Sequence, residues 1–217
     1  GIRAEWASYP SLSSQLKQQV DAICQAWADE KALPEMGFTL GGLREINDSD
    51  TRLLLALDEE ERIHAVTSWM PVHSGGKVIG LTLDVMRRDD SGFHLAIDFL
   101  IGQAALLAQD EGLQFISLSG APLAESGQCE ESAELADSRF AFASVLDVMG
   151  SVMEPVYGFR SLLAYKKKFQ VRFVPLYLAI PDIANAPAVG LAIAHAYLPN
   201  MSAASAVGVA AKLVSRD

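Results

Sequence analysis

Three short runs with strand character, separated by turn-forming spacers, constrain the fold of this chain more than any other feature. The runs cover residues 52–57, 63–69 and 77–86. The spacers include Asp-Glu-Glu-Glu-Arg at 58–62 and His-Ser-Gly-Gly at 73–76. Spacers of this length are typical of β-hairpins, whereas parallel neighbours need a crossover of a dozen or more residues. We therefore predict an antiparallel meander.

Helices are predicted on both sides of this meander. Residues 11–30 repeat apolar side chains at helical spacing after a Ser-rich start that offers N-caps. Residues 93–110 have the composition of a longer helix, which a buried strand at 115–118 follows. The candidate caps of this second helix are Asp89, Asp90 and Ser91 at its start and Gly112 at its end.

The order of the elements predicts the fold class. Beyond residue 118 we expect a turn at 119–122, an acidic loop at 127–137, helices at 138–149 and 161–169, a strand at 173–180, and Ala-rich helices at 183–198 and 202–214. The whole order gives an α+β (mixed α/β) pattern with one central, mostly antiparallel sheet flanked by helices. It is compatible with an acyltransferase fold of the GNAT type.

Charge limits the classes of partner. The chain of 217 residues has a formal net charge of −10, which argues against general polyanion binding. Five of its seventeen basic residues nevertheless fall in one short segment. They are Arg160, Lys166, Lys167, Lys168 and Arg172. Such a patch on an acidic protein indicates a local anionic partner, and the alternative is a solvated end of an amphipathic helix.

Cysteine usage and hydropathy limit the cellular compartments that suit this chain. Cys24 and Cys129 lie far apart without a CxxC motif, which argues against a disulfide framework and suits a reducing compartment. Residues 1–10 are polar and lack an initiator Met, so we expect a piece of a longer protein and no secretory signal here. The most apolar window, 183–198, is shorter than a bilayer span requires.

The third predicted strand ends in candidate catalytic residues. In a regular strand Gly80, Thr82 and Asp84 share one face, and Arg87 points away from Asp84. A bulge near residues 85–87 would bring the two charged side chains together. Two interpretations stay open: an ion pair that stabilises the strand end, or a carboxylate that binds an amine or acts as a base beside an arginine that binds phosphate or ester.

Other catalytic signatures are missing from the sequence. Ser119 lies in a loop after a strand, but without GxSxG or a local His it predicts a turn hydrogen bond rather than a nucleophile. The four histidines lack metal-ligand spacing, so no metal site is predicted. Gly41-Gly42 and Gly75-Gly76 are expected to be hairpin glycines, since no phosphate loop continues from them. The nearest match to an acyl-CoA loop, residues 101–104, lies inside a predicted helix, so no cofactor is predicted.

Five motifs, in order, resemble one known family. They are GFTLGGL (37–43), SWMP (68–71), LDVMRR (83–88), LSGAPL (118–123) and the segment from YGFR to LAIP (157–181). Together they resemble the C-terminal cytosolic region of bacterial phosphatidylglycerol lysyltransferases, also called lysylphosphatidylglycerol synthases or multiple peptide resistance factors. The resemblance covers about residues 33–182.

The resemblance implies a domain organisation and a location. Residues 33–182 would form a GNAT-like aminoacyltransferase domain, between a joining helix at 1–32 and a helical extension at 183–217. An upstream GNAT-like half and a membrane-embedded domain would be its partners in the full-length protein. The domain would work at the cytoplasmic face of the bacterial membrane.

The resemblance also implies a reaction. Family members transfer an aminoacyl group, lysyl or alanyl, from aminoacyl-tRNA to the glycerol hydroxyl of phosphatidylglycerol without coenzyme A, which changes lipid charge and resistance to antimicrobial peptides. Asp84 and Arg87 match the family's Asp-x-Met-Arg motif and are the candidate catalytic residues. Tyr165 replaces the first Phe of its Phe-Lys-x-Lys-Phe motif. The predicted substrate-binding residues are Lys166, Lys168, Arg88, Ser119 and Tyr157.

These residues suit transfer from an ester that is already activated, because the enzyme then needs orientation and charge stabilisation but no covalent intermediate. Asp84 would bind the α-ammonium group or relay the hydroxyl proton, and Arg87 would bind a phosphate. Lys166 and Lys168 would hold the tRNA acceptor end or the lipid head group. Two alternatives stay open: a GNAT-type acyl-CoA-dependent N-acyltransferase, and a non-catalytic tRNA- or lipid-docking half of a larger synthase.

Overall fold

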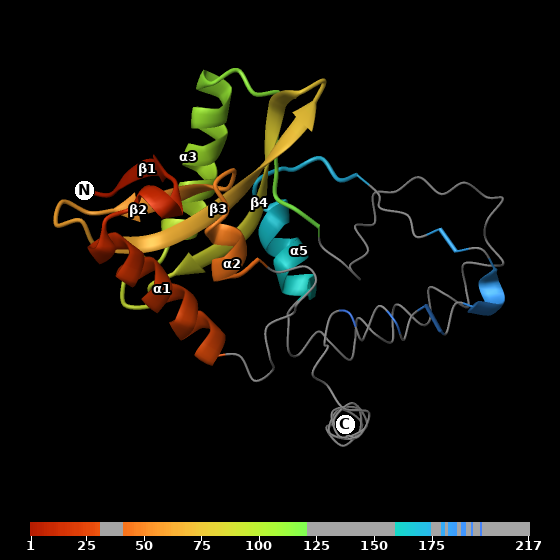
Figure 1. The fold of residues 1–217 in the computed structure, drawn as a ribbon, viewed down its shortest axis with the longest axis horizontal. Coiled ribbons are helices and arrows are strands. Elements are labelled where there is room, and N and C mark those ends of the chain that lie inside the picture. Colours follow the sequence, from red (N-terminus) through yellow and green to blue (C-terminus); the bar gives the residue numbers. More distant parts are fainter. Residues whose placement is uncertain are drawn as a thin grey trace. The chain divides into compact units, whose positions relative to one another are not determined.

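The meander predicted from the sequence forms the middle of a five-stranded sheet. In the computed structural model the strand order is β1-β2-β3-β4-β5 (Figure 1). β2 (Arg52–Leu57), β3 (Ile63–Ser74) and β4 (Lys77–Arg88) are antiparallel neighbours. Gly75 and Gly76 in the second hairpin have φ of 56° and 74°, a conformation that glycine adopts without steric cost. Both predicted hairpins are therefore confirmed.

The structure describes residues 1–30, 41–120, 159–174, 179–180, 182–185, 188–189, 192 and 196. These residues fall in two units. The first unit holds the described residues up to Ser119 and contains the whole sheet. The second unit begins at Gly120 and contains α5 (Phe159–Lys167).

The N-terminal segment differs from the prediction. Residues 1–32 are predicted to be a joining helix, but β1 (Arg3–Ala7) pairs antiparallel with β2 along its whole length. α1 (Ser14–Asp29), which Ser13 caps, packs on the same sheet. The segment is therefore part of the sheet unit. β1 adds a fifth strand at the edge of the sheet, beside β2. A strand of five residues gives little periodicity in the sequence, so the pattern did not predict it.

The two faces of the sheet carry different helices. α1 and the short α2 (Leu43–Ile46) pack on one face, which we call the α1 face. α3 (Ala96–Asp110) packs on the other, the α3 face (Figure 1). The buried core of the α1 face consists of Val20, Ile23, Ile46, Leu53, Leu55, Leu57, Ile63, Val66 and Val85. Burial of such side chains is the main stabilising contribution, about 1.5–3 kcal/mol for each.

α3 begins later than predicted. The acidic cluster at 89–91 was a candidate N-cap for a helix at 93–110, but the helix begins at Ala96 without a side-chain cap. Asp89 instead accepts hydrogen bonds within the loop after β4, from the backbone and hydroxyl of Ser91. The predicted end is confirmed, because Gly112 follows the helix with φ of 75°.

β5 (Phe115–Ser117) is the parallel strand of the sheet. It pairs with the middle of β4 over three residues, and Thr82 opposite Ser117 is the last pair. β4 continues to Arg88. The C-terminal half of β4 therefore has no neighbouring strand on this side among the residues that the structure describes.

The predicted fold class, α+β with a mostly antiparallel sheet flanked by helices, is confirmed. The predicted basic helix is α5. The predicted strand at 173–180 is wrong where it can be checked, because residues 173–174 and 179–180 carry no strand. The predicted elements at 127–137, 138–149 and 202–214, and most of 183–198, lie outside the described residues. In the described part of the chain, no helix has the length and hydropathy needed to cross a membrane.

Candidate functional site

An extra residue in β4 determines where the candidate catalytic side chains point. β3 and β4 pair regularly on both sides of one position, in the pairs Thr67–Met86 and Trp69–Leu83. Between these pairs Asp84 and Val85 together lie opposite the single residue Ser68. This is a β-bulge, which shifts the alternation of side chains along β4 by one residue.

The bulge turns Asp84 and Arg87 to the same face. Thr82 lies opposite Met70 and Arg87 opposite Val66, and these two β3 residues are four apart and share a face. Asp84 is two residues from Thr82 and lies on that face too, which is the α1 face. The bulge that the sequence required to bring the two charged side chains together is therefore present.

Asp84 is a half-buried carboxylate with only one satisfied oxygen. The Gly41 N–H donates a hydrogen bond to Oδ1 at 3.1 Å. Oδ2 is buried and has no hydrogen-bond partner among the described residues. Burial raises the pKa of Asp84 and repulsion by Glu45 adds to this, against the opposing effects of the Gly41 N–H and the Arg87 charge. An orphaned buried oxygen with a raised pKa is typical of a functional site.

Gly41 lies where a side chain does not fit. A Cβ atom at this position would lie 1.7 Å from Asp84 Oδ2. Gly41 and Gly42 lead into α2, whose Glu45 accepts a hydrogen bond from the Gly42 N–H at 2.9 Å. The expectation that these are hairpin glycines is therefore wrong. The sequence indicated this position only through the GFTLGGL motif, because a Gly-Gly pair alone does not show what approaches it.

Arg87 is covered by an indole ring. Its side chain is 6% exposed, and its guanidinium carbon lies 3.3 Å from the centroid of the Trp27 ring in the last turn of α1. Its Nη1 donates to the Met86 carbonyl at 3.0 Å. Stacking of this kind fixes the plane of a guanidinium group. The sequence pattern identifies Trp27 only as an apolar helix position and does not reveal which strand residue it contacts.

Arg88 lies apart from Asp84. Neighbouring residues of a strand point to opposite faces, and Arg88, opposite Ala65, belongs to the α3 face. It forms an ion pair with Asp90 at 3.0 Å and donates to the His94 carbonyl at 3.2 Å. The structure does not bring this predicted substrate-binding residue to the candidate site.

Ser119 follows β5 at the place where pairing with β4 has ended. Asp84 and Ser119 are each two residues beyond the last pair, Thr82–Ser117. Ser119 is exposed and has φ of 64°, which is uncommon outside glycine, and its N–H donates to the Ser117 hydroxyl at 3.1 Å. Residues 121–122 of the predicted turn lie outside the described residues, so the turn stays a prediction.

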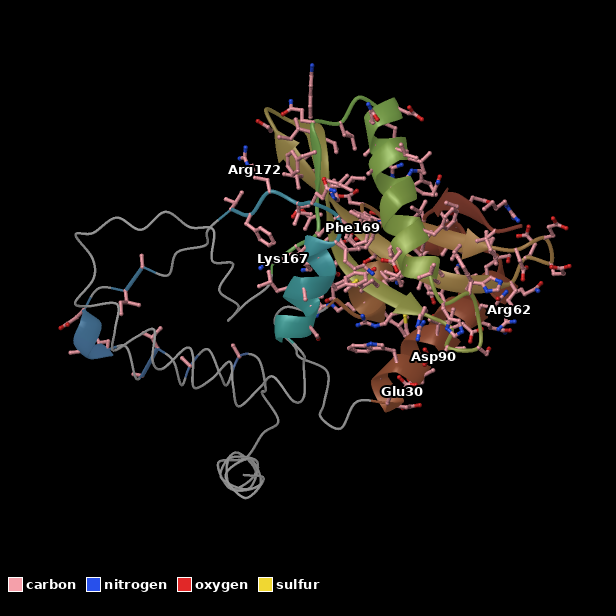
Figure 2. The ribbon with its side chains drawn as sticks, turned by 180° about the vertical axis from the view of Figure 1, so that it is seen from behind. Glu30, Arg62, Asp90, Lys167, Phe169 and Arg172 are labelled. Atoms are coloured by element: carbon pink, nitrogen blue, oxygen red, sulfur yellow. The ribbon has the colours of Figure 1, made fainter. Side chains whose placement is uncertain are left out.

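The basic motif on α5 is only partly exposed. Lys166 is 6% exposed, and its Nζ donates to the Gly120 carbonyl at 2.6 Å. Burial lowers the pKa of Lys166 to about 8. Lys168 is exposed, with Nζ 4.5 Å from the Tyr165 ring centroid. Tyr157 lies outside the described residues. In the described part of α5 and the segment after it, Lys167, Lys168 and Arg172 are exposed, and Figure 2 labels Lys167 and Arg172.

The loop between β4 and α3 is acidic. Arg62 in the turn before β3 donates to Asp89 at 2.5 Å, and Figure 2 shows Arg62 and Asp90 together at this end of the sheet. An acyl-CoA loop that opens a helix must offer N–H groups or cations to phosphates. The loop that opens α3 presents two carboxylates instead. No group of three or more metal-ligating side chains comes together in the described residues.

Sequence comparison identifies relatives of this chain. Residues 1–180 match a family model described as "Phosphatidylglycerol lysyltransferase, C-terminal". An uncharacterized protein of Corynebacterium glutamicum is 43% identical over 198 residues, which cover 91% of this chain and 24% of that protein. The lysylphosphatidylglycerol biosynthesis bifunctional protein LysX of Mycobacterium ulcerans is 26% identical over 187 residues, which cover 85% of this chain and 16% of LysX. The chain thus spans less than a quarter of the length of these relatives.

Two solved structures share the fold. The structure of L-PGS from Bacillus licheniformis has a TM-score of 0.64 at 20% identity, over 91% of this chain and 56% of that chain. A C-terminal domain (DUF2156) from Agrobacterium fabrum has a TM-score of 0.68 at 18% identity, over 93% of this chain and 56% of that chain. The α+β fold predicted from the sequence is shared by these two structures.

Proposed function

The chain belongs to the C-terminal family of phosphatidylglycerol lysyltransferases, and from this premise we propose that it transfers an aminoacyl group, lysyl or alanyl, from aminoacyl-tRNA to the glycerol hydroxyl of phosphatidylglycerol. One observation carries the proposal. Asp84 presents a buried carboxylate oxygen that has no hydrogen-bond partner in the described part of the chain, on the same face as Arg87. This arrangement supports recognition of a cation or a proton at a defined point.

Asp84 is the central residue of the proposed reaction. The lipid hydroxyl oxygen attacks the ester carbonyl, the bond to the tRNA ribose oxygen breaks, and one proton passes from the lipid hydroxyl to that ribose oxygen. Asp84 Oδ2 either accepts a hydrogen bond from the α-ammonium group, which positions the ester, or relays this proton. Orientation alone provides a large part of the rate enhancement in such transfers.

Arg87 supplies positive charge beside this carboxylate. In the proposal it binds the phosphate of the lipid or of the tRNA end. Its low exposure makes it a buried charge of fixed orientation, because Trp27 covers one face of the guanidinium group. A charge with little solvent around it interacts with an anion more strongly than a surface lysine does.

The exposed cations of α5 and of the segment after it have a different role. We assign to Lys168, together with Lys167 and Arg172, the attraction of the tRNA acceptor end. Lys166 was expected to share this role, but its Nζ is bonded to the Gly120 carbonyl and is buried. Its contribution in the proposal is therefore to the conformation of the second unit.

The partners belong to the proposal as well. Because the chain spans only 16–24% of its curated relatives, we propose an upstream GNAT-like half and a membrane-embedded domain as partners, at the cytoplasmic face of the membrane. The acyl-CoA alternative is less well supported, since the loop that opens α3 carries Asp89 and Asp90. A non-catalytic docking module would bind the same partners without transferring the aminoacyl group, so the transfer assay distinguishes it from the proposed enzyme.

The test is a transfer assay on the chain alone and on a longer protein that contains the upstream half. Labelled lysyl-tRNA or alanyl-tRNA is supplied with phosphatidylglycerol vesicles, and label extracted with the lipid is counted. We expect label in the lipid that Asp84→Asn abolishes and that Asp90→Asn, a change of an exposed carboxylate, leaves in place. Absence of label from both proteins, with tRNA still bound, supports a docking module. Absence of label together with tight acetyl-CoA binding supports an N-acyltransferase.

A further inference from the structure

The SWMP motif is not explained by the proposed reaction, yet its first residue lies opposite the bulge. Ser68 is fully buried in the middle of β3. Its hydroxyl accepts a hydrogen bond from the Val85 N–H at 2.9 Å. The next residue, Trp69, is also buried, and its indole N–H donates to the Thr67 hydroxyl at 2.9 Å.

This hydrogen bond is made at the bulge, where the regular backbone pairing of β3 and β4 is interrupted. Where two residues of one strand lie opposite one residue of the other, the extra residue loses its regular partner in the backbone ladder. A buried N–H group without an acceptor is strongly unfavourable. Ser68 is the single residue opposite Asp84 and Val85, and its hydroxyl is an acceptor for the Val85 N–H within the bulge.

We infer that Ser68 is a positioning residue, whose hydroxyl holds the bulge in β4 and thereby keeps Asp84 on the same face as Arg87. Without the bulge the two side chains would lie on opposite faces, because they are three residues apart in a strand. Ser68 itself is not assigned any contact with substrate. The kinetic part of this inference rests on the proposed function, but the structural part does not.

The variants Ser68→Ala and Ser68→Cys test the inference. The first removes the acceptor, and the second keeps nearly the same volume with a much weaker acceptor, so that it remains informative where the alanine variant does not fold. Ser74→Ala is the control, because Ser74 is exposed at the end of the same strand.

Two measurements on the chain alone need no activity. Hydrogen exchange of the Val85 amide, followed by NMR, is expected to become at least about tenfold faster than in the wild type. The pKa of Asp84, followed by carboxyl carbon shifts, is expected to move down toward its ordinary value as the bulge relaxes and the carboxylate becomes exposed. Unchanged exchange and an unchanged Asp84 titration in both Ser68 variants would overturn the inference.

A third measurement links the bulge to the proposed transfer. In the longer protein we expect kcat to fall by about tenfold with KM for the lipid within about twofold, since a misplaced carboxylate affects the chemical step more than lipid binding. A fall in activity that only follows the loss of folded protein, with the Asp84 titration unchanged, assigns Ser68 a purely structural role. If the wild type transfers nothing, the proposed function fails, and the two NMR measurements still decide the positioning role.

Discussion

Two aspartates near the end of β4 differ in how completely their oxygens are satisfied. Asp89 accepts hydrogen bonds at Oδ1 from Ser91 and at Oδ2 from Arg62. These contacts, led by the Arg62 guanidinium, lower the pKa of Asp89. Asp84, five residues earlier, has one hydrogen bond to Oδ1, a buried Oδ2 without a partner among the described residues, and a raised pKa.

We interpret Asp89 as a carboxylate that stabilises the fold and Asp84 as one that, in the proposed function, binds a ligand. Asp89 joins the turn before β3 to the loop after β4, and both of its carboxylate oxygens accept hydrogen bonds. Asp84 lies beyond the last β4–β5 pair, and its Oδ2, which has no hydrogen-bond partner among the described residues, costs stability. Buried polar groups that cost stability in this way are concentrated at functional sites. Both residues look alike in the sequence.

Exchanging the two carboxylates for amides separates these roles most clearly. Asp84→Asn is expected to lower transfer by about 10²–10⁴-fold, the range for loss of a proton-transfer group, because the amide neither takes a proton nor binds an ammonium group as well. Asp89→Asn is expected to leave transfer within about twofold and to lower the free energy of unfolding by about 0.5 kcal/mol, as for an exposed ion pair. Transfer rates and urea unfolding of both variants measure this, and equal losses of transfer would contradict the comparison.

A methyl group at Gly41 tests whether the position of Asp84 matters. Gly41→Ala places Cβ against Asp84 Oδ2, so the carboxylate or the backbone must move. A displacement near 1 Å at a reacting group costs about 10²-fold in rate, and overpacking costs about 1–3 kcal/mol of stability.

The matched control is Gly102→Ala in α3, where a Cβ atom meets nothing within 4 Å. Alanine is the better helix former by about 1 kcal/mol, so this variant is expected to be more stable and equally active. Thermal unfolding and the transfer assay report both effects. Full transfer by Gly41→Ala would show that Asp84 is not held in place for the reaction.

Two tryptophans that stack on arginines allow a similar pair of variants. Trp27 covers Arg87 on the α1 face, and Trp6 lies over Arg52 with 4.1 Å from the guanidinium carbon to its ring centroid. Each alanine variant is expected to lose roughly 1–2 kcal/mol of stability from the cation–π contact and its packing. Only Trp27→Ala is expected to lower transfer, by about tenfold, because of the two arginines only Arg87 belongs to the proposed site. An equal effect of Trp6→Ala on the rate, at matched folded fraction, would contradict this.

The pH dependence of stability is the smallest expected effect, and its sign differs between the two aspartates. The raised pKa of Asp84 means that its ionised form destabilises the fold, so Asp84→Asn is expected to gain stability at pH 7. This gain is lost as the pH falls through the raised folded-state pKa of Asp84, and it is absent below the ordinary value of 3.8. Since Asp84 is partly exposed, the gain is about a few tenths of a kcal/mol.

The lowered pKa of Asp89 means the reverse. Its ionised form contributes stability at neutral pH, which is lost as the pH falls through its lowered folded-state pKa. Unfolding curves of wild type, Asp84→Asn and Asp89→Asn from pH 3 to pH 8 measure both signs. A stability difference of the same sign for the two variants at pH 7 would show that the environments are not opposite.

The sequence predicted the middle of the fold well and its edges less well. The hairpins on both sides of β3 could be predicted because short spacers allow only antiparallel pairing of consecutive strands, and alternating apolar residues fix the register. β1 was missed because five residues with mixed exposure carry little periodic signal. The start of α3 was placed too early because Asp89 and Ser91, both good cap residues, instead bond to each other and to Arg62.

The candidate site shows the same division. Asp84 and Arg87 were named from their motif, and the need for a bulge followed from strand alternation, but the sequence did not show that the bulge exists. Trp27 and Gly41 were assigned other roles, as a helix position and a hairpin glycine. Lys166 was grouped with the exposed lysines, although its Nζ bonds to the chain itself.

Alternating residues, local strand pairing and the family motifs could be read directly from the chain, because these features depend on neighbours in the sequence. Only the folded structure shows which of two similar aspartates has a carboxylate oxygen without a partner among the described residues, which glycine lies against it and which tryptophan covers Arg87. Those facts depend on residues that are 43 and 60 positions apart in the chain, and the single extra residue in β4 that brings them to one face becomes visible only in the register with β3.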